Sequence, residues 1–435
     1  MRNKPVFQNY KEVEQYLYRQ LPMFQRIGKK AFKKDLDNII ALCESLGNPH
    51  KDFRSIHIAG TNGKGSVAHI LAALLESSFS KTGIYTSPHL KDYRERIKIN
   101  GKNIPRQAVQ HFISDNLSLI EKIKPSFFEI SVALAFWWFR EQEVDMAIIE
   151  TGLGGRLDST NVILPELSVI TNIGYDHQTF LGPTLKHIAR EKAGIIKPGV
   201  PVVIGSRHPE TEAVFDKRAE ELSAPIQYAD EVCEVEIKER YPLSVDYKIY
   251  HNNKTLTQEA DLVGAYQVEN IRTSVAACHV YSARNSGYKF DLEKDIKNIE
   301  HVCSRLNFKG RWQILAQDPL IIADGAHNLE GLTFVADQIE LTPHDRLHLI
   351  LGLVMEKDPI KTLQKFPHNA IFYLTKADVP RAMSLQRLEQ AAKELGLNYK
   401  TYQKPSTALL KAKGRATSKD LIFIGGSLFL VAELV

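Results

Sequence analysis

Three glycines and one lysine between residues 60 and 66 have the types and spacing that phosphate binding requires. Glycines let the backbone approach a ligand and point several N–H groups at one spot, and the Lys64 ammonium adds positive charge. The segment Gly-Thr-Asn-Gly-Lys-Gly-Ser departs from the common pattern G-x-x-x-x-G-K-[ST], because Gly65 separates Lys64 from Ser66. Residues 55–59 are typical of a buried strand, and the apolar residues after Ser66 recur at helical spacing. A phosphate loop is therefore predicted, with a nucleoside triphosphate as its ligand.

Polar residues also follow two further predicted strands, at the sheet edge where open α/β folds bind ligands. Glu150 ends a strand at 144–150, and a carboxylate in that place commonly holds Mg²⁺ on phosphates. The glycine-rich residues 151–158 that follow favour this interpretation over a carboxylate that only caps a turn. His177 follows a strand at 167–172, where a metal or phosphate contact competes with a purely structural role.

Strands alternate with helices on both sides of a segment at 306–312 that breaks the pattern. Before it we expect further strands at 82–86, 93–101 (exposed, turning at Asn100-Gly101) and 200–204. Helices are expected at 10–21, 33–46, 105–122, from 127, 184–196, 266–283 and 291–303. A solvated loop is expected at 22–30, and a β-rich flap around 232–264. After it we expect strands at 320–323, 346–351, 370–375 and 421–424, with helices at 332–340, 359–366 and 385–395. The fold class is α/β, with a doubly wound, phosphate-loop-containing N-terminal domain at 1–305, a linker at 306–312 and a smaller Rossmann-like C-terminal domain at 313–435.

The composition is typical of a globular protein, with 43% hydrophobic and 25% charged residues. A net charge of +5 from 56 basic and 51 acidic residues suits an anionic substrate and does not require nucleic acid as a partner. No run of about 18 apolar residues occurs, so no membrane span is expected. Four scattered cysteines and the lack of an apolar leader predict reduced thiols, a cytoplasmic protein and no zinc site.

Taken together, these motifs resemble folylpolyglutamate synthase and dihydrofolate synthase, which are Mur-type ATP-dependent amide ligases. The matching segments run in the family's order over most of the chain, and Glu-Thr-Gly-Leu-Gly-Gly-Arg-Leu-Asp-Ser-Thr-Asn at 150–161 is the most specific. The other matching segments are 60–66, 86–90, 94–97, 128–129, 176–177, 191–194 and 324–328. The resemblance implies an N-terminal domain like the Mur-ligase central domain and a C-terminal glutamate-ligase domain.

The resemblance also implies the reaction. In this family ATP phosphorylates a pteroate or folate carboxylate, and the amine of L-glutamate then displaces phosphate to form an amide. The expected co-substrate is ATP, with Mg²⁺ at two sites, and the expected acceptors are dihydropteroate and reduced folate. Both activities are expected in one chain, because bacterial family members commonly combine them. Small molecules are the expected partners, without nucleic acid or membrane, and the protein is expected to be a monomer.

Residues at matching positions take the roles that the family assigns. ATP would be bound by Gly60, Thr61, Asn62, Gly63, Lys64, Gly65, Ser66, Asn270 (adenine), Arg311 (phosphates) and Asp324 (ribose). Metal would be bound by Ser66, Ser87, Glu150, His177 and Lys192, the last as an N-carboxylated lysine (carbamate). The folate or pteroate would meet Phe128, Glu129, Asp158 and Ser159. Catalysis would depend on Lys64, Lys192 and His327, with His327 near the transferring phosphate and glutamate.

A few positions depart from the family pattern. Lys309 stands where the family usually has a proline before the Gly-Arg of the linker, which would loosen that hinge. Ser159 replaces the more usual alanine after Asp158 and adds a hydroxyl near the expected pteridine edge. Residues 24–29 differ from the commonest wording of the family's folate loop, so pterin contacts are not assigned there.

Three other interpretations remain open. A peptidoglycan ligase of the Mur type is disfavoured because only a short, mostly helical segment precedes the phosphate loop. A nucleotide-switch or nucleic-acid-binding ATPase would suit the basic balance, but no stripe of basic and aromatic residues occurs. A non-catalytic family member is disfavoured because Lys64, Glu150, His177 and Lys192 are all present. The choice of acceptor, the number and linkage of glutamates, Lys192 carbamylation and the oligomeric state are left open by the sequence.

Overall fold

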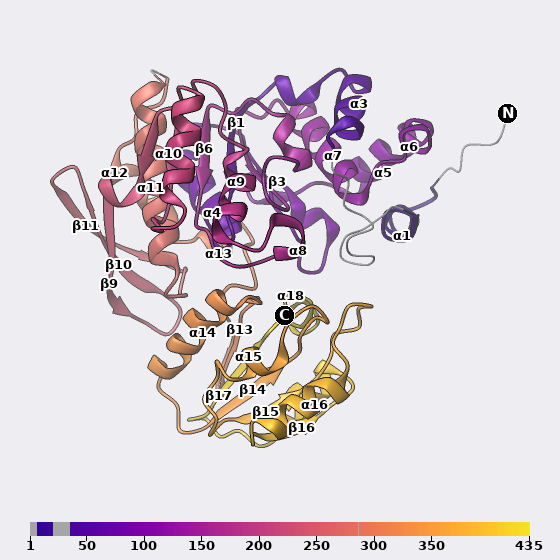
Figure 1. Cartoon of the computed structure of the whole chain (residues 1–435), viewed down its shortest axis with the longest axis vertical. Coiled ribbons are helices and arrows are strands. Elements are labelled where there is room, and N and C mark those ends of the chain that lie inside the picture. Colours follow the sequence, from indigo (N-terminus) through magenta and orange to yellow (C-terminus); the bar gives the residue numbers. More distant parts are fainter. Residues whose placement is uncertain (1–6, 21–34, 286) are drawn as a thin grey trace. The chain divides into compact units, whose positions relative to one another are not determined.

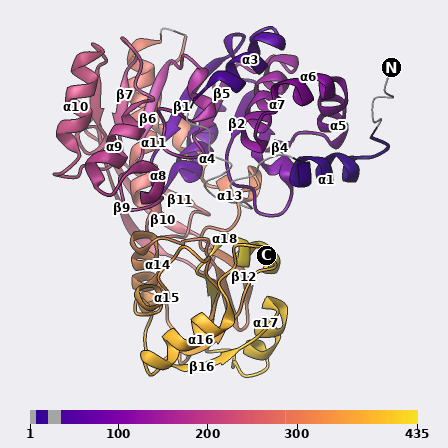
Figure 2. The ribbon, with the colours of Figure 1, turned by 45° about the vertical axis from the view of Figure 1, so that its right-hand side comes forward.

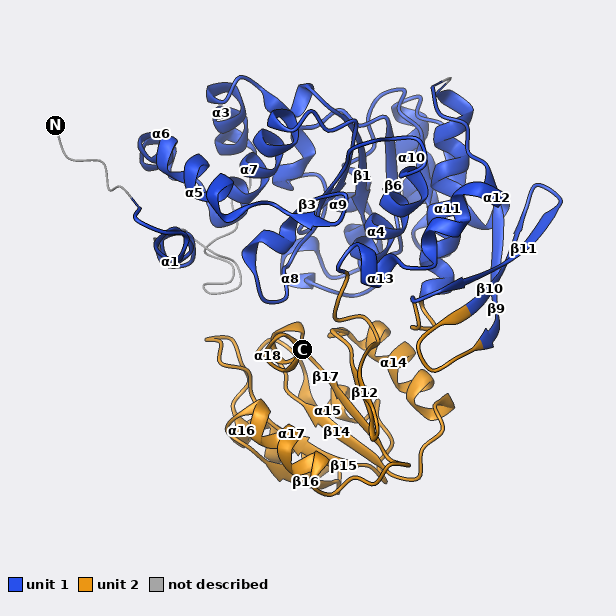
Figure 3. Cartoon of the chain, turned by 180° about the vertical axis from the view of Figure 1, so that it is seen from behind, with its two compact units in different colours: residues 1–239, 246–261, 267–307 blue, residues 240–245, 262–266, 308–435 orange. Residues whose placement is uncertain are grey.

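The computed structural model describes residues 7–20, 35–285 and 287–435. The loop predicted at 22–30 lies outside these residues. The chain forms two compact units (Figure 3): unit 1 comprises residues 1–239, 246–261 and 267–307, and unit 2 comprises residues 240–245, 262–266 and 308–435. Every helix among the described residues is too short or too polar to cross a membrane.

A β-sheet forms the centre of unit 1 (Figure 1). It has eight strands, in the order β4-β3-β2-β5-β1-β6-β7-β8. The strands are β1 (Arg54–Ala59), β2 (Thr82–Tyr85), β3 (Ile97–Ile99), β4 (Lys102–Asn103), β5 (Met146–Glu150), β6 (Leu167–Ile170), β7 (Val202–Ile204) and β8 (Ile226–Tyr228). β3 and β4 form an antiparallel edge, whereas the other six strands pair in parallel. The parallel strands are short apolar runs because helices cover both of their faces.

The helices of unit 1 lie on both faces of this sheet (Figure 2). They are α1 (Tyr10–Gln20), α3 (Asp37–Ser45), α4 (Lys64–Leu75), α5 (Arg106–Asp115), α6 (Leu117–Ile123), α7 (Phe127–Glu141), α8 (Gln178–Leu181), α9 (Leu185–Ala193), α10 (Glu212–Glu221), α11 (Gln267–Arg284), α12 (Leu292–Asp295) and α13 (Val302–Arg305). α4 and α11 pack on each other and contact the strands, and α9 packs on α10.

The strands β9 (Cys233–Arg240), β10 (Val245–His251) and β11 (Lys254–Ala260) form a separate three-stranded sheet.

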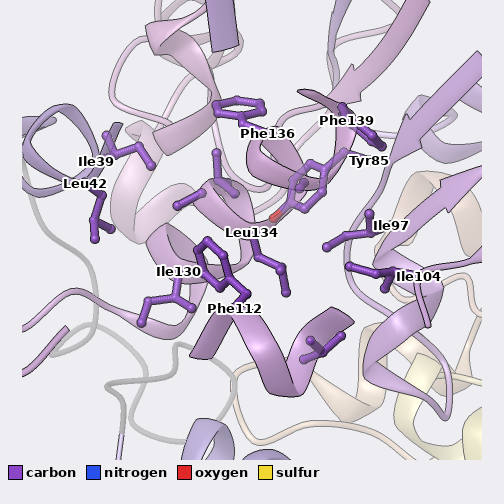
Figure 4. Packing of buried hydrophobic residues seen from close by; sticks show 14 of the residues in the cluster. Ile39, Leu42, Tyr85, Ile97, Ile104, Phe112, Ile130, Leu134, Phe136 and Phe139 are labelled. Carbon is purple, nitrogen blue, oxygen red and sulfur yellow. The ribbon is translucent and has the colours of Figure 1, made fainter. Parts of the chain in front are cut away.

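A large apolar cluster holds α3, α5 and α7 against the β2–β5 half of the sheet (Figure 4). Its members include Phe136 and Phe139 of α7, with Tyr85 of β2 and Ile97 of β3. The run of apolar residues in α7 therefore forms a buried helix, as the sequence predicted. This packing fixes the first turn of α7, which carries two predicted site residues.

Unit 2 contains a six-stranded sheet in the order β12-β13-β17-β14-β15-β16. Its elements are β12 (Gln313–Gln317), β13 (Leu320–Ala323), α14 (Leu329–Leu341), β14 (Leu347–Leu351), α15 (Pro359–Leu363), β15 (Ile371–Leu374), α16 (Leu385–Glu394), β16 (Asn398–Thr401), α17 (Pro405–Lys413), β17 (Leu421–Gly425) and α18 (Leu428–Leu434). Only β12 runs antiparallel to its neighbour; the other strands are parallel.

Several local predictions were wrong. The segment at 93–101 is not an exposed strand, because a capping box of Asp92 and Glu95 makes Tyr93–Arg96 a short 3₁₀ helix and the following Ile97 is buried. Its turn at Asn100-Gly101 is confirmed, since both residues have positive φ angles. The helices predicted at 105–122 and 291–303 are each broken into shorter pieces. The strands β8, β12 and β16 and the helices α10, α17 and α18 were not predicted.

Candidate active site

The loops after β1, β5 and β6 meet at one edge of the sheet because these three strands are neighbours. Ile58 of β1 is in register with Glu150 of β5, and Ala59 of β1 is in register with Ile170 of β6. The next strand of the chain after β1 is β2, and it lies on the β5 side of β1. The next strand after β6 is β7, and it lies on the opposite side, beyond β6. The strand order therefore reverses between β1 and β6. Open α/β folds bind ligands at such a point.

The loop after β6 holds the phosphate loop in position. The Asn172 backbone carbonyl accepts a hydrogen bond from Thr61 N (2.9 Å), and its side-chain Oδ1 accepts one from Asn62 N (2.8 Å). The Thr171 hydroxyl donates to the Asn62 carbonyl at 2.6 Å. These bonds satisfy part of the loop's backbone within unit 1 and fix its path beside the loop after β6.

Two glycines of the loop have no room for a side chain. A methyl group on Gly60 would overlap Oγ1 of Thr171, and one on Gly63 would overlap Oδ1 of Asn270. Gly63 also has a φ of 83°, which favours glycine. Asn270, predicted to meet adenine, therefore lies directly against the phosphate loop, and its Nδ2 donates to Gln267 Oε1 at 2.8 Å.

Two lysines converge on the carbonyl oxygen of Gly60. Lys64 donates to Gly60 O at 3.0 Å and to Thr61 O at 3.1 Å, and Lys192, from α9, donates to Gly60 O at 2.6 Å. Lys192 is 3% exposed. Burial, and after it the positive charge of Lys64, lower the pKa of the Lys192 amine well below its ordinary value. The arrangement thus offers one half-buried lysine at the loop and one buried amine behind it.

The predicted metal ligands come from several elements around these loops. Glu150 ends β5, Ser87 follows β2 and His177 follows β6, whereas Ser66 lies in α4 and Lys192 in α9. The Ser87 backbone N–H donates to Oε2 of the buried Glu150 at 3.0 Å, so the structure brings these two residues together. His177 begins α8 with a positive φ of 49°, and its Nε2 lies 3.9 Å from Oδ2 of Asp176. Among the described residues, no group of three or more His, Cys, Asp or Glu side chains is placed to hold a metal. A metal here would need oxygens of a nucleotide, a hydroxyl or a modified lysine as well.

The glycine-rich loop after β5 is organised by Asp158. Its Oδ2 accepts hydrogen bonds from Gly152 N (2.8 Å) and Leu153 N (2.9 Å), and its Oδ1 accepts them from Thr160 N (3.0 Å) and Thr160 Oγ1 (2.6 Å). Burial raises the pKa of this carboxyl group, although the hydrogen bonds act in the opposite direction. Ser159 follows it at the start of a 3₁₀ turn and is half-buried. Asp158 therefore closes the loop on itself.

The same loop is fastened to α9. The Arg156 side chain pairs with Glu191 at 2.9 Å, and the Arg156 N–H donates to the Glu191 carbonyl at 2.8 Å. Asn161 Nδ2 donates to the carbonyls of Arg156 (3.0 Å) and Gly194 (3.1 Å). These contacts connect the two family segments at 150–161 and 191–194, and they hold the helix that carries Lys192.

Phe128 and Glu129 stand in the first turn of α7, beside the glycine-rich loop. The half-buried Phe128 ring fills the space over Gly152, where a methyl group would lie 2.5 Å from the ring. Oε2 of Glu129 accepts hydrogen bonds from Ser126 N (2.5 Å) and from Asn38 Nδ2 (3.2 Å). Glu129 thus forms a capping box with Ser126, a pairing that the spacing Ser-x-x-Glu could have revealed in the sequence.

In unit 2 the predicted residues gather around Asp324, at the end of β13. Its Oδ2 accepts hydrogen bonds from Tyr266 OH and Trp312 N, both at 2.6 Å, and its Oδ1 accepts one from Ala326 N at 2.7 Å. The Arg311 guanidinium donates to Gly310 O at 3.0 Å, and Gly310 O also accepts from Gly325 N at 2.9 Å. His327 Nδ1 lies 3.0 Å from Gly325 O, so this nitrogen carries the hydrogen. Asp324 thereby joins the segment that carries Arg311 to the one that carries His327.

Comparison with known proteins identifies the family. Residues 58–278 match the family model described as Mur ligase middle domain, and residues 310–428 match the one described as Mur ligase, glutamate ligase domain. The chain is 30% identical over 442 residues to the dihydrofolate synthase/folylpolyglutamate synthase of Bacillus subtilis, covering 99% of both proteins. The chain belongs to the dihydrofolate synthase and folylpolyglutamate synthase family of Mur ligases.

Two further comparisons agree. A probable bifunctional folylpolyglutamate synthase/dihydropteroate synthase of Haloferax volcanii is 30% identical; the match covers 92% of this chain but 48% of that protein, so the chain spans about half of its length. The structure of Escherichia coli FolC in complex with DHPP and ADP superposes with a TM-score of 0.84 at 27% identity, covering 99% of this chain and 97% of that one. Membership confirms the predicted α/β fold with two domains and the predicted class of enzyme, an ATP-dependent glutamate ligase of folate metabolism.

The sequence did not reveal which residues position the site of this ligase. Thr171 and Asn172 hold the phosphate loop, and Tyr266 binds the Asp324 carboxylate, yet none of the three was singled out. Asn172 carried a usable signal, because an amide at the end of an apolar strand can bond to the backbone of a neighbouring loop. Tyr266 carried none, because its partner lies 58 residues away along the chain.

Proposed function

We propose that this enzyme uses ATP to join L-glutamate to the carboxylate of both dihydropteroate and reduced folates. The observation that carries the proposal is the convergence of Lys64 and Lys192 on Gly60, within a glycine-rich loop at the point where the strand order reverses. The Bacillus subtilis relative is named for both activities and matches over 99% of both proteins. In the Escherichia coli relative the bound molecules are DHPP and ADP.

In the first step an oxygen of the acceptor carboxylate attacks the γ-phosphorus of ATP, and ADP leaves. Two anions must approach each other, so positive charge and N–H donors lower the barrier most. Lys64 and those backbone N–H groups of residues 60–66 that Asn172 does not bind would supply them in unit 1, and Arg311 would supply a further positive charge from unit 2. Asn270 and Asp324 would contact adenine and ribose.

In the second step the glutamate amine attacks the acyl carbon, inorganic phosphate leaves, and the amine loses a proton as the amide forms. The amine must be neutral to attack, and water must be kept away from the acyl phosphate. His327 is half-buried in unit 2 and would lie beside the phosphate and the glutamate. Phe128, Glu129, Asp158 and Ser159 would shape the acceptor's side, and Ser159 would contribute a hydroxyl rather than a charge.

The residues of unit 1 fit Mg²⁺, which prefers oxygen ligands. The Glu150 carboxylate and the hydroxyls of Ser66 and Ser87 are such ligands, with His177 as a further one. A buried Lys192 amine that attacks CO₂ would lose a proton and become a carbamate anion, completing a second Mg²⁺ site. Bound Mg²⁺ would neutralise phosphate charge.

The remaining features are proposed with the same reaction. We assign ATP binding to residues 1–305 and glutamate ligation to residues 313–435, with 306–312 as the linker. The protein would act as a monomer in the cytoplasm. A measurement of its molar mass by light scattering tests whether it is a monomer.

A paired assay tests the function. Purified protein is incubated with ATP, Mg²⁺ and L-glutamate, with dihydropteroate in one tube and tetrahydrofolate in the other, and products are read by mass. We expect one added glutamate residue or more in both tubes, and none with a Lys64→Ala variant. Product in one tube only would restrict the enzyme to that acceptor. ATP hydrolysis without a glutamylated product in either tube would overturn the proposal.

A further inference from the structure

A lysine that no part of the proposed reaction uses is buried in the edge hairpin of unit 1. Lys98 lies on β3 and is 3% exposed. Its ammonium nitrogen donates to the backbone carbonyls of Leu306 and Asn307, both at 2.9 Å, and to Nε2 of His69 at 3.2 Å. An ammonium group has three N–H donors, so these three acceptors use all of them. A long, flexible side chain is thereby held in one place.

His69 continues this chain of bonds to the phosphate loop. It lies on α4, and its Nδ1 is 2.6 Å from the carbonyl oxygen of Gly65. A carbonyl oxygen only accepts, so Nδ1 carries the hydrogen and Nε2 presents its lone pair to Lys98. One imidazole ring therefore connects a residue of the nucleotide loop to Lys98.

The other end of the chain of bonds is where the polypeptide leaves unit 1 for the last time. Leu306 and Asn307 are its last residues, and the chain enters unit 2 at residue 308. Two more contacts hold this exit to the same elements. Arg305 pairs with Glu76, just after α4, at 2.6 Å, and the Arg305 carbonyl lies 2.5 Å from where a methyl group on Gly101 would stand.

We propose that Lys98 and His69 are positioning residues that couple nucleotide binding at residues 60–66 to the exit segment at 302–307. Neither residue is among those assigned to the substrates under the proposed function. A change in the backbone at Gly65 moves the acceptor of His69, and Lys98 transmits that change because its other two bonds are to the exit carbonyls. By linkage, the coupling works in both directions: a fixed exit segment favours the loop conformation that binds nucleotide.

The inference rests on the proposed nucleotide binding, but not on the identity of the acceptor. Its test uses the full chain with AMPPNP and Mg²⁺, without folate or glutamate. Amide hydrogen exchange is measured for peptides covering 60–75 and 302–307, in the wild type and in Lys98→Met. Methionine keeps the unbranched apolar stem of the side chain and removes the three donors. Lys102→Met, an exposed lysine on the neighbouring strand β4, is the matched control.

In the wild type and in Lys102→Met we expect AMPPNP to slow exchange in both segments. In Lys98→Met we expect slower exchange at 60–75 only, with the dissociation constant of AMPPNP changed by less than about threefold. The kcat of glutamate ligation should then fall about tenfold, with little change in KM for ATP. The reason is that the variant loses its hydrogen bonds to the charged group at residues 302–307 and not at the phosphate loop.

A second variant protects the test against misfolding. His69→Asn places an amide donor near the position of Nδ1, facing the Gly65 carbonyl, and has no atom at the position of Nε2, so it loses the bond to Lys98 and should also uncouple the two segments. Failure of AMPPNP to protect 60–75 in the wild type would count against the proposed function. Two results would overturn this inference alone. One is that AMPPNP protects 60–75 but does not change exchange at 302–307 in the wild type. The other is that AMPPNP protects 302–307 equally in Lys98→Met and in the wild type.

Discussion

The side-chain nitrogen of Lys192 lies 2.6 Å from the carbonyl oxygen of Gly60, the same oxygen that accepts a hydrogen bond from Lys64 at 3.0 Å. Burial and the neighbouring Lys64 lower the pKa of Lys192 well below its ordinary value of 10.5. As pH falls below 10.5, the unfolded chain takes up a proton here that the folded chain resists, so the unmodified lysine costs the folded state stability at neutral pH. A group that destabilises the fold in this way is a candidate for function.

We therefore expect Lys192→Met to fold at least as stably as the wild type and to lose about a hundredfold or more in kcat, because an electrostatic group of the active site is removed. Thermal unfolding and ligation rates check the two halves of this prediction. ¹³C-bicarbonate added to the wild type should give a carbamate resonance that Lys192→Met lacks. Activity of Lys192→Met within threefold of the wild type would contradict the assigned role.

Gly63→Ala should abolish tight nucleotide binding. A methyl group there overlaps Oδ1 of Asn270, and the φ of 83° is strained for any residue with a Cβ. We expect at least a tenfold weaker affinity for ADP, measured by calorimetry, from a strain of about 1–3 kcal/mol. Gly287→Ala is the matched control, because a methyl group on Gly287 meets nothing within 4 Å. Equal affinities of the two variants would argue against a binding role for this loop.

Asp158→Asn separates a structural role from a substrate contact. The carboxylate accepts four hydrogen bonds from its own loop, and an asparagine amide cannot accept all of them. We expect the free energy of unfolding of unit 1 to fall by about 1.5–3 kcal/mol, with KM affected for every substrate. Ser159→Ala should leave stability unchanged and alter KM for the acceptor only. A stable Asp158→Asn variant with a defect confined to the acceptor would reverse the assignment.

The buried His57 predicts a pH dependence of stability. Its Nε2 lies 2.9 Å from the Thr160 hydroxyl, and burial, followed by the charge of Lys197, lowers its pKa to about 3. Between pH 6.5 and pH 3 the unfolded chain binds a proton at this position that the folded chain does not, so acid destabilises the fold in that range. From pH 6.5 to pH 5 the loss should be about 2 kcal/mol.

The variant His57→Gln keeps a partner for Thr160 and has no proton to gain. We expect its melting temperature to fall less than that of the wild type between pH 7 and pH 5. Parallel curves for the two proteins would mean that His57 is protonated in the folded state.

The sequence predicted the elements on which the site is built, because β1, β5 and β6 are short segments rich in β-forming residues and the apolar residues of α4 recur at helical spacing. It failed where side chains far apart in sequence decide the local structure. Lys98 was expected on an exposed strand, yet it is buried because Leu306 and Asn307 supply acceptors from 208 and 209 residues away. The short helix at Tyr93–Arg96 failed for a local reason, since its capping box was visible and was overlooked.

In the candidate site, too, the sequence indicated local features better than contacts between residues far apart in the chain. Residue types at the loop ends supplied the candidate residues of the site, but not the partners that these residues have in the fold. Asp158 and Asp324 were expected to meet ligands, whereas their carboxylates accept hydrogen bonds from their own units. Resemblance aligns residues by family position, and position alone does not distinguish a residue that touches a substrate from one that shapes the loop around it.

The central place of β1 in the sheet has a consequence for how the protein is made. A nascent chain that has left the ribosome only as far as β5 contains all of residues 60–66. It lacks Asn172, 110 residues beyond Asn62, and it lacks Asn270, against which Gly63 packs. Contacts between distant residues form only after the later segment has been synthesised. The proposed ATP site is therefore complete only late in translation, when α11 has emerged, and ATP bound there cannot stabilise the growing N-terminal half before that point.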